Sequence, residues 1–166
     1  MSYKTNKFLH ISTEDDPSIQ TISTTYIELT GSKCEVKSIK SNSVLMYKYS
    51  FYAQGNEPLT NELQTFWLHI KLQKSNDNFS SNIVDIPNCL INFSGDTKEI
   101  ESNGDYYYKT FTSFFIVENF DSKYLRLVAR SYDTDHKAKL HRGYYYDGSS
   151  NVNGIYYNPS LIVAEL

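Results

Sequence analysis

The sequence has too few cysteines to hold its fold together with disulfides or a zinc site. Cys34 and Cys89 are the only two in 166 residues, and they lie too far apart to form the paired Cys-x-x-Cys half-sites of a zinc module. We therefore interpret both as buried free thiols. A chain of this length can bury a core without such cross-links.

Long apolar runs and clusters of positive charge are also missing. No apolar segment approaches the roughly 20 residues that span a bilayer, and residues 1–16 contain no apolar stretch typical of a secretory signal. We expect no membrane span, and synthesis in a cytoplasm. The net charge is −3 with the lysines and arginines scattered, so we expect no nucleic-acid partner.

The common catalytic motifs are absent as well. The sequence contains no G-x-S-x-G elbow, Walker loop or dinucleotide fingerprint, and no two of its histidines have the i, i+4 spacing of a zinc protease. Carboxylates are plentiful, but the sequence alone cannot place two of them across a groove, as glycoside hydrolysis requires. We expect a protein that is not an enzyme and that binds no cofactor.

Asp133, Asp135 and His136 form one cluster of possible metal ligands. Their oxygen and imidazole groups could bind a divalent cation, but the further acidic positions and the glycine of an EF-hand loop are missing. The same residues are typical of a turn between two strands, which is the interpretation we favour. His136 and His141 are five residues apart, so on an extended strand they would face opposite sides of the sheet.

Alternating apolar residues are the strongest pattern in the chain. Aromatic residues make up 15% of it and favour pleated, half-buried strands over helices. Residues 44–53 and 65–73 each put a row of large apolar side chains on one face, and the second segment puts the only tryptophan, Trp67, on its more polar face. Residues 106–117 are apolar on both faces, which indicates a strand deep in a sheet or against another subunit. Further strands are expected at residues 25–29, 34–39, 90–93, 124–131, 138–145 and 161–166.

Turn-forming residues separate these segments and predict an antiparallel β-sandwich or barrel. The polar residues 1–20 are expected to form an N-terminal arm or linker, and residues 21–166 a single domain without internal repeats. The expected turns are Gly31-Ser32, Ser41-Asn42-Ser43, Gly55 to Pro58, Lys74 to Ser81, Gly95-Asp96, Asn103-Gly104-Asp105, Asp147-Gly148 and Asn153-Gly154.

The beginning and the end of the chain resemble a recurring module of virion proteins from marine tailed phages. A threonine-rich entry at residues 21–32 and an aromatic strand at 43–51 form the first part of the likeness. The second part is a Leu-x-x-Arg-x-Tyr strand and a Lys-Leu-His strand within residues 124–141, a Tyr-Asp-Gly turn within 144–150 and a Pro-x-Leu strand within 159–166. These modules are similar to the trimeric jelly-roll heads of tumour necrosis factor and complement component C-one-q. Residues 74–101 lie outside the likeness.

The resemblance implies an antiparallel jelly-roll sandwich that forms a homotrimer in a virion. It also implies a non-enzymatic role, either as the head of a fibre or as a capsid decoration protein, in attachment or particle assembly. The expected partners are copies of the same chain, other virion proteins and a glycan or protein of the host surface. The alternatives are a carbohydrate-binding β-sandwich module and a polysaccharide-degrading tail protein.

Seven residues are candidates for surface or subunit contacts. Tyrosine and tryptophan provide rigid, amphipathic contact area, and two arginines share one face of the strand at residues 124–131. The alternative for the tyrosines is packing inside the sandwich, because neighbours on a strand point to opposite faces. The candidates are Trp67, Tyr106, Tyr108, Arg126, Arg130, Tyr144 and Tyr146.

Overall fold

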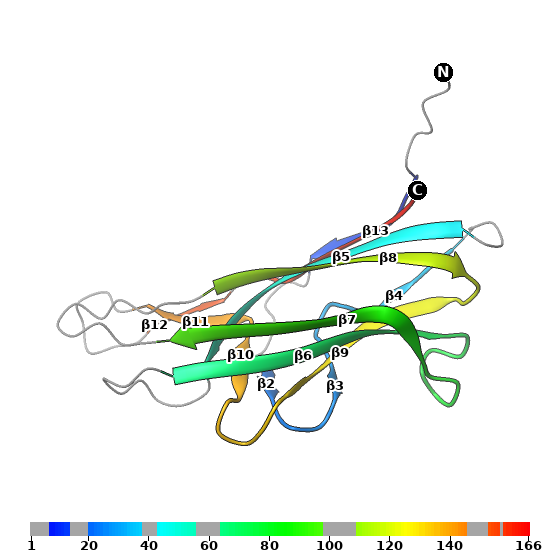
Figure 1. Cartoon of the computed structure of the whole chain (residues 1–166). Helices are drawn as coiled ribbons and strands as arrows, with labels where there is room; N and C mark the ends of the chain where they lie inside the picture. The colour runs from blue at the N-terminus through cyan, green and yellow to red at the C-terminus, as the bar shows by residue number, and fades with distance from the viewer. Residues whose placement is uncertain are drawn as a thin grey trace.

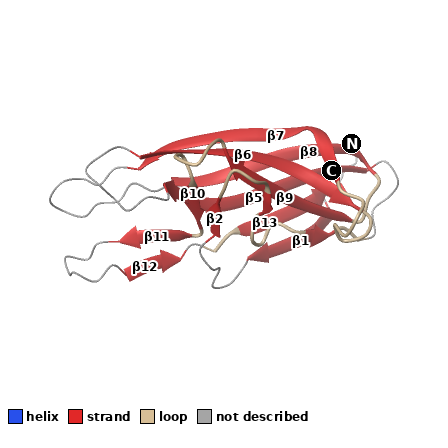
Figure 2. Cartoon of the chain, turned by 90° about the horizontal axis from the view of Figure 1, so that it is seen from below, coloured by secondary structure: helices blue, strands red, loops and turns tan. Residues whose placement is uncertain are grey.

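Two antiparallel β-sheets pack face to face in this protein and form a β-sandwich (Figure 1). The computed structural model describes residues 7–13, 20–37, 43–55, 64–97, 109–145, 153–156 and 158–166. Within these ranges every regular element is a strand (Figure 2), and they contain no helix that could cross a membrane. The all-β sandwich predicted from the alternating pattern is confirmed.

The first sheet is built around one long central strand, β5 (Ser43–Gly55). One edge of β5 pairs with β8 (Lys109–Phe120), and the other pairs first with β13 (Ser160–Glu165) and then with β10 (Ala138–Leu140). Two edge strands complete this sheet: β1 (Lys7–Thr13) beside β13 and β2 (Gln20–Ile22) beside β10.

The second sheet contains β9 (Tyr124–Ser131), β6 (Gln64–Ser75) and β7 (Val84–Thr97) in that order. Two short strands, β3 (Ile27–Glu28) and β4 (Cys34–Glu35), share the free edge of β9. A separate two-stranded sheet is formed by β11 (Arg142–Tyr145) and β12 (Asn153–Tyr156). Figure 1 shows this pair at one end of the sandwich.

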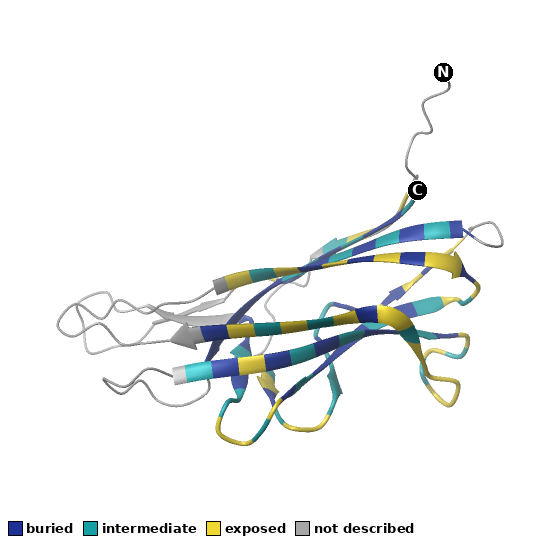
Figure 3. Ribbon diagram, in the orientation of Figure 1, coloured by how far each residue is buried: buried dark blue, intermediate teal, exposed yellow. Residues whose placement is uncertain are grey.

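Alternation along the strands builds the core between the two sheets. Buried residues alternate with half-buried or exposed residues along β6 and β8 in Figure 3, as expected for strands with one face in the core. Tyr47 and Tyr49 are fully buried, and their hydroxyl groups donate hydrogen bonds to the carbonyl oxygens of Ser32 and Thr30. These bonds satisfy the phenol oxygens, so tyrosine can occupy core positions.

Both cysteines are buried and free, as the sequence predicts. Burial raises the pKa of the Cys34 thiol to about 12 and also raises the pKa of Cys89. Each thiol therefore behaves as a small apolar core group.

The structure corrects the predicted turns at Gly95-Asp96 and Asn153-Gly154. Gly95 and Asp96 belong to β7 and pair with Phe66 and Thr65 of β6. Gly95 is needed there because a Cβ at this position would lie 2.6 Å from the ring of Phe66. Residues 153 and 154 start β12 rather than forming a turn.

Other boundaries also differ from the prediction. The strand expected at 138–145 is interrupted at His141, whose φ of 66° breaks the extended backbone between β10 and β11. Lys74 and Ser75 extend β6 beyond the predicted strand end. Residues 7–13 of the expected arm pair with β13, while the division of the chain at residue 20 stays a prediction. The turn residues at positions 41–42, 56–58, 103–105 and 147–148 lie outside the described residues.

Candidate functional site

Exposed aromatic rings gather on the outer face of the second sheet. Trp67 of β6 is 46% exposed and Tyr132, just after β9, is 64% exposed. Their ring centroids are 6.0 Å apart. His136 lies 6.2 Å from Trp67 and His69 lies 6.5 Å from Tyr132, again between ring centroids. These four residues are called the Trp67 patch below.

The loop after β9 is held in place against β6. The amide of Trp67 donates a hydrogen bond to the carbonyl oxygen of His136. Within the loop, Oδ1 of Asp133 accepts bonds from the amides of Asp135 and His136 and lies 2.7 Å from Nδ1 of His136. The bond with His136 is the main cause that lowers the pKa of Asp133. His136 is therefore positioned by backbone and side-chain bonds as well as by its ring contact with Trp67.

The same geometry assigns Asp133, Asp135 and His136 to a turn between β9 and β10. Oδ1 of Asp133 is engaged in that turn, and no group of three or more possible metal ligands occurs in the part of the chain that the structure describes.

Polar side chains surround the Trp67 patch in two neighbouring rows of the sheet. Ser94 of β7 pairs with Trp67, and Asn92 pairs with His69, which in turn pairs with Arg130 of β9. Paired residues point to the same face, so these side chains share the outer face with the patch. Both Ser94 and Asn92 are exposed.

Arg130 is a cation without an ion pair among the described residues. Its guanidinium carbon lies 5.2 Å from the ring centroid of Tyr26. Its Nε atom is buried and has no hydrogen-bond partner in the described part of the chain. Arg130 is thus the one predicted arginine with unused hydrogen-bonding capacity beside the patch.

Arg126, the second predicted arginine, is engaged within the fold. Its Nε donates to Oε1 of Gln73, its Nη1 donates to Oε2 of Glu28, and its guanidinium carbon lies 4.1 Å from the ring centroid of Phe79. These contacts tie β9 to β6, to β3 and to the β6–β7 loop. Both arginines lie on the outer face of the second sheet, but Arg126 forms an ion pair with a described residue and Arg130 forms none with the described residues.

A different surface occupies the outer face of the first sheet. The register aligns Phe8, Ala164, Met46 and Ile116 in one row across four strands, and Ile11, Ile162, Lys48 and Phe114 in the next. A bulge between Phe8 and His10 puts Phe8 and Ile11, three positions apart, on the same side. Phe8, Ile11, Phe114 and Ile116 are 42–65% exposed. These eight residues are called the apolar face below.

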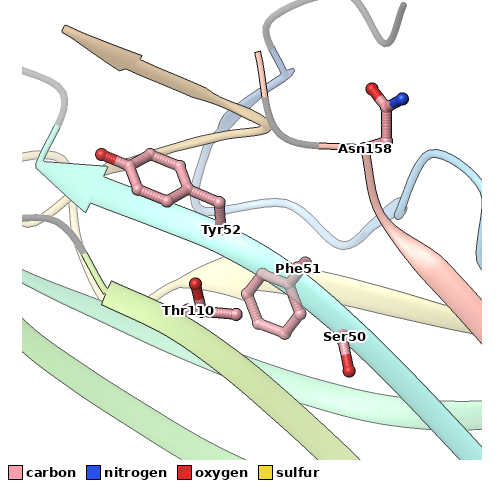
Figure 4. Close-up of a pocket in the computed structure, with 5 residues that line it drawn as sticks. All are labelled: Ser50, Phe51, Tyr52, Thr110 and Asn158. Atoms are coloured by element: carbon pink, nitrogen blue, oxygen red, sulfur yellow. The ribbon is translucent and has the colours of Figure 1, made fainter. Parts of the chain in front are cut away.

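A small hollow lies at one end of β5 and β8 (Figure 4). Ser50, Phe51, Tyr52, Thr110 and Asn158 line a volume of about 60 Å³. That space holds only about two water molecules, so it cannot enclose a sugar or a cofactor.

Of the seven predicted contact residues, Trp67, Arg126 and Arg130 have described side chains. All three lie on the outer face of the second sheet, with Trp67 and Arg130 in neighbouring rows. Tyr106, Tyr108 and Tyr146 lie outside the described residues, and for Tyr144 the structure describes only the backbone of β11. The sequence analysis missed Tyr132 and His69, although both follow the alternation of their strands. It also missed Phe114 and Ile116 individually, although it noted that residues 106–117 are apolar on both faces.

No protein-family model and no curated protein matches this chain.

Proposed function

We propose that this protein is a non-enzymatic structural protein of a virion that works as a homotrimer, as a fibre head or a capsid decoration protein. The observation that supports assembly most directly is the apolar face. The virion role is an inference from the resemblance to phage modules of residues 21–32, 43–51, 124–141, 144–150 and 159–166.

The apolar face carries large hydrophobic side chains where the solvent-facing side of a sheet usually carries polar ones. Phe8, Ile11, Phe114 and Ile116 form a continuous surface with Met46 and Ile162 rather than scattered positions. Contiguous exposed apolar patches mark interaction surfaces. Lys48 is the one charged residue in the two rows, so the face fits another apolar surface better than a polar ligand.

A second copy of the chain is the occupant we propose for this face. Most soluble oligomers are closed, symmetric assemblies of one chain. β8 has β5 as its only strand neighbour in the described sheet, and we propose that the same association covers its other edge. An uncovered edge strand would otherwise invite uncontrolled pairing.

The strand order supports the jelly-roll part of the proposal. One sheet has the order β1-β13-β5-β8, and the other has β9, β6 and β7 with β3 and β4 along the edge of β9. Among the consecutive strands from β4 to β10, only β6 and β7 are neighbours in one sheet; the other connections pass between the sheets. Double-sheet jelly rolls have such crossing connections.

Light scattering on the purified chain tests the assembly. We expect a mass three times that of the 19.2 kDa monomer. The double substitution Phe114→Ser with Ile116→Ser should return the mass to that of the monomer, because it removes two large apolar side chains from the proposed interface. Leu90→Ser is the matched control, since Leu90 is equally exposed but lies on β7, and it should leave the mass unchanged. A monomeric wild-type protein would overturn the trimer.

A further inference from the structure

We propose that the outer face of the second sheet binds a glycan, with a pyranose ring stacked on Trp67 and Tyr132. The inference deepens the proposed function, because it names the class of receptor that an attachment protein of this kind would contact. It rests on the Trp67 patch and its polar surroundings, which are separate from the apolar face.

The exposed rings provide a stacking surface of the right kind. The indole of Trp67 and the phenol of Tyr132 are inclined to each other by 42°, so together they form a shallow, open angle rather than a closed stack. Aromatic side chains with one apolar face and one polar group suit ligands that are themselves amphipathic. A pyranose is such a ligand, because its C–H bonds form an apolar face and its hydroxyl groups form a polar rim.

Hydrogen-bonding groups lie where the rim of the sugar would lie. Ser94 is the sheet neighbour of Trp67, and Asn92 and Arg130 flank His69 in the next row. Arg130 brings donors that are not engaged in an ion pair with any described residue. Asn92 can both donate and accept, as vicinal hydroxyl groups require. An apolar protein partner would leave these polar groups unpaired at a cost, which favours a sugar as the occupant.

The patch is also preorganised. Trp67 and His69 stand on β6, a central strand of the sheet, and the bond from the amide of Trp67 to the carbonyl oxygen of His136 ties the loop after β9 to that strand. A site that is ordered before binding loses less conformational freedom when the ligand arrives. A shallow site of this size still binds a single sugar weakly, so several copies displayed together would bind a surface better than one.

The chain contains a single tryptophan, so its intrinsic tryptophan fluorescence reports on this site alone. Four soluble probes cover the main pyranose chemistries: cellohexaose, chitohexaose, mannohexaose and hexagalacturonate. We expect at least one of them to change the emission of Trp67 in a saturable way. If none does so up to ~10 mM, well above the ~1 mM dissociation constant of a weak single site, the glycan site is overturned.

Two variants then test the location of the site with the tryptophan signal intact. Tyr132→Ala should weaken binding of the active probe about tenfold or more, the loss expected for a residue that dominates a contact surface. Leu90→Ala, which changes an exposed apolar residue two rows away on the same sheet face, should bind as the wild type does. Unchanged binding by Tyr132→Ala, with an unchanged melting temperature, would refute the stacking role.

The outcome is distinguishable from that of the assembly experiment. The Phe114→Ser, Ile116→Ser variant changes only the apolar face, and the fluorescence titration measures the affinity of a single site. This variant should therefore keep the dissociation constant of the wild type for the active probe. A monomeric wild-type protein that binds the probe would overturn the trimer and retain the glycan site.

Discussion

His141 makes a pH-dependent contribution to stability that can be worked out from its surroundings. The imidazole is fully buried, and neither ring nitrogen has a hydrogen-bond partner among the described residues. Burial lowers the pKa of His141 from 6.5 to about 4, and no neighbouring charge contributes to the shift. The folded protein therefore holds this side chain in its neutral form.

The sign and the size of the effect follow from proton linkage. Above pH 6.5 the histidine is neutral in both states, and its contribution to stability is fully present. Between pH 6.5 and about 4 the unfolded chain binds a proton at this residue that the folded chain does not. The free energy of unfolding should therefore fall by about 1.4 kcal/mol per pH unit in this range, a loss of about 2 kcal/mol by pH 5.

The substitution His141→Asn isolates this contribution. Asparagine tolerates the positive φ of this position but does not titrate. Guanidinium unfolding of both proteins at a fixed concentration, at several values between pH 7.5 and 4.5, gives the difference in free energy of unfolding. The cavity left by the smaller side chain changes this difference by the same amount at every pH. The titration of His141 destabilises only the wild type as the pH falls, so it makes the difference shrink. A difference that stays constant over this range would refute the reasoning.

Three further predictions follow from buried or bonded groups. Gly95→Ala should destabilise the fold by about 1–3 kcal/mol, the usual cost of overpacking, because the new Cβ meets the ring of Phe66; an unchanged melting temperature would contradict this. Asp77→Ala should speed hydrogen exchange at the amides of Ser81 and Asn82, because both amides donate hydrogen bonds to Oδ2 of Asp77. Amides in β9 should exchange as before. Unchanged exchange at Ser81 and Asn82 would show that the carboxylate does not hold the β6–β7 loop in place. Burial raises the pKa of Cys34 to about 12, so its thiol should react with a thiol reagent at pH 8 only as fast as the fold opens. In guanidinium both thiols should react at once, and equally rapid reaction of the native protein would show that the Cys34 thiol is not buried.

The central strands could be predicted from the sequence because each has one face in the core. In β5, β6 and β9 every second residue is apolar and buried over most of the strand, so period two is visible without the structure. β9 has the predicted bounds, residues 124–131. The fold class follows from these strands alone.

The edge strand β7 could not be predicted in full, because it contains residue types and backbone irregularities that are typical of turns. It contains Pro87, a positive φ at Asn88, a register shift opposite Lys71 and Gln73, and Gly95 beneath Phe66. Proline and irregular backbone are tolerated at an edge, where one side of the strand has no partner. The local sequence therefore indicates only the short strand at residues 90–93. The full length of β7 is evident only from its pairing with β6.

The candidate sites were harder to predict, because both depend on register. Trp67 and Tyr132 are far apart in sequence and meet only because Leu68 pairs with Ser131 in the adjacent position. The apolar face likewise combines β1, β13, β5 and β8 from the two ends and the middle of the chain. Alternation shows that a side chain faces outward, but it does not show which outward side chains share a row.

The two surfaces divide the proposed work between opposite sides of the sandwich. We propose that the apolar face assembles the chain and that the Trp67 patch contacts the glycan. Linked copies of a weak site can raise the overall avidity by about 10²–10⁴ without any new contact. The Phe114→Ser, Ile116→Ser monomer should therefore bind the soluble probe as the wild type does, yet lose most of its retention on a surface coated with the same oligosaccharide. Equal retention of the two proteins would mean that assembly has no part in attachment, because a single site would then be sufficient.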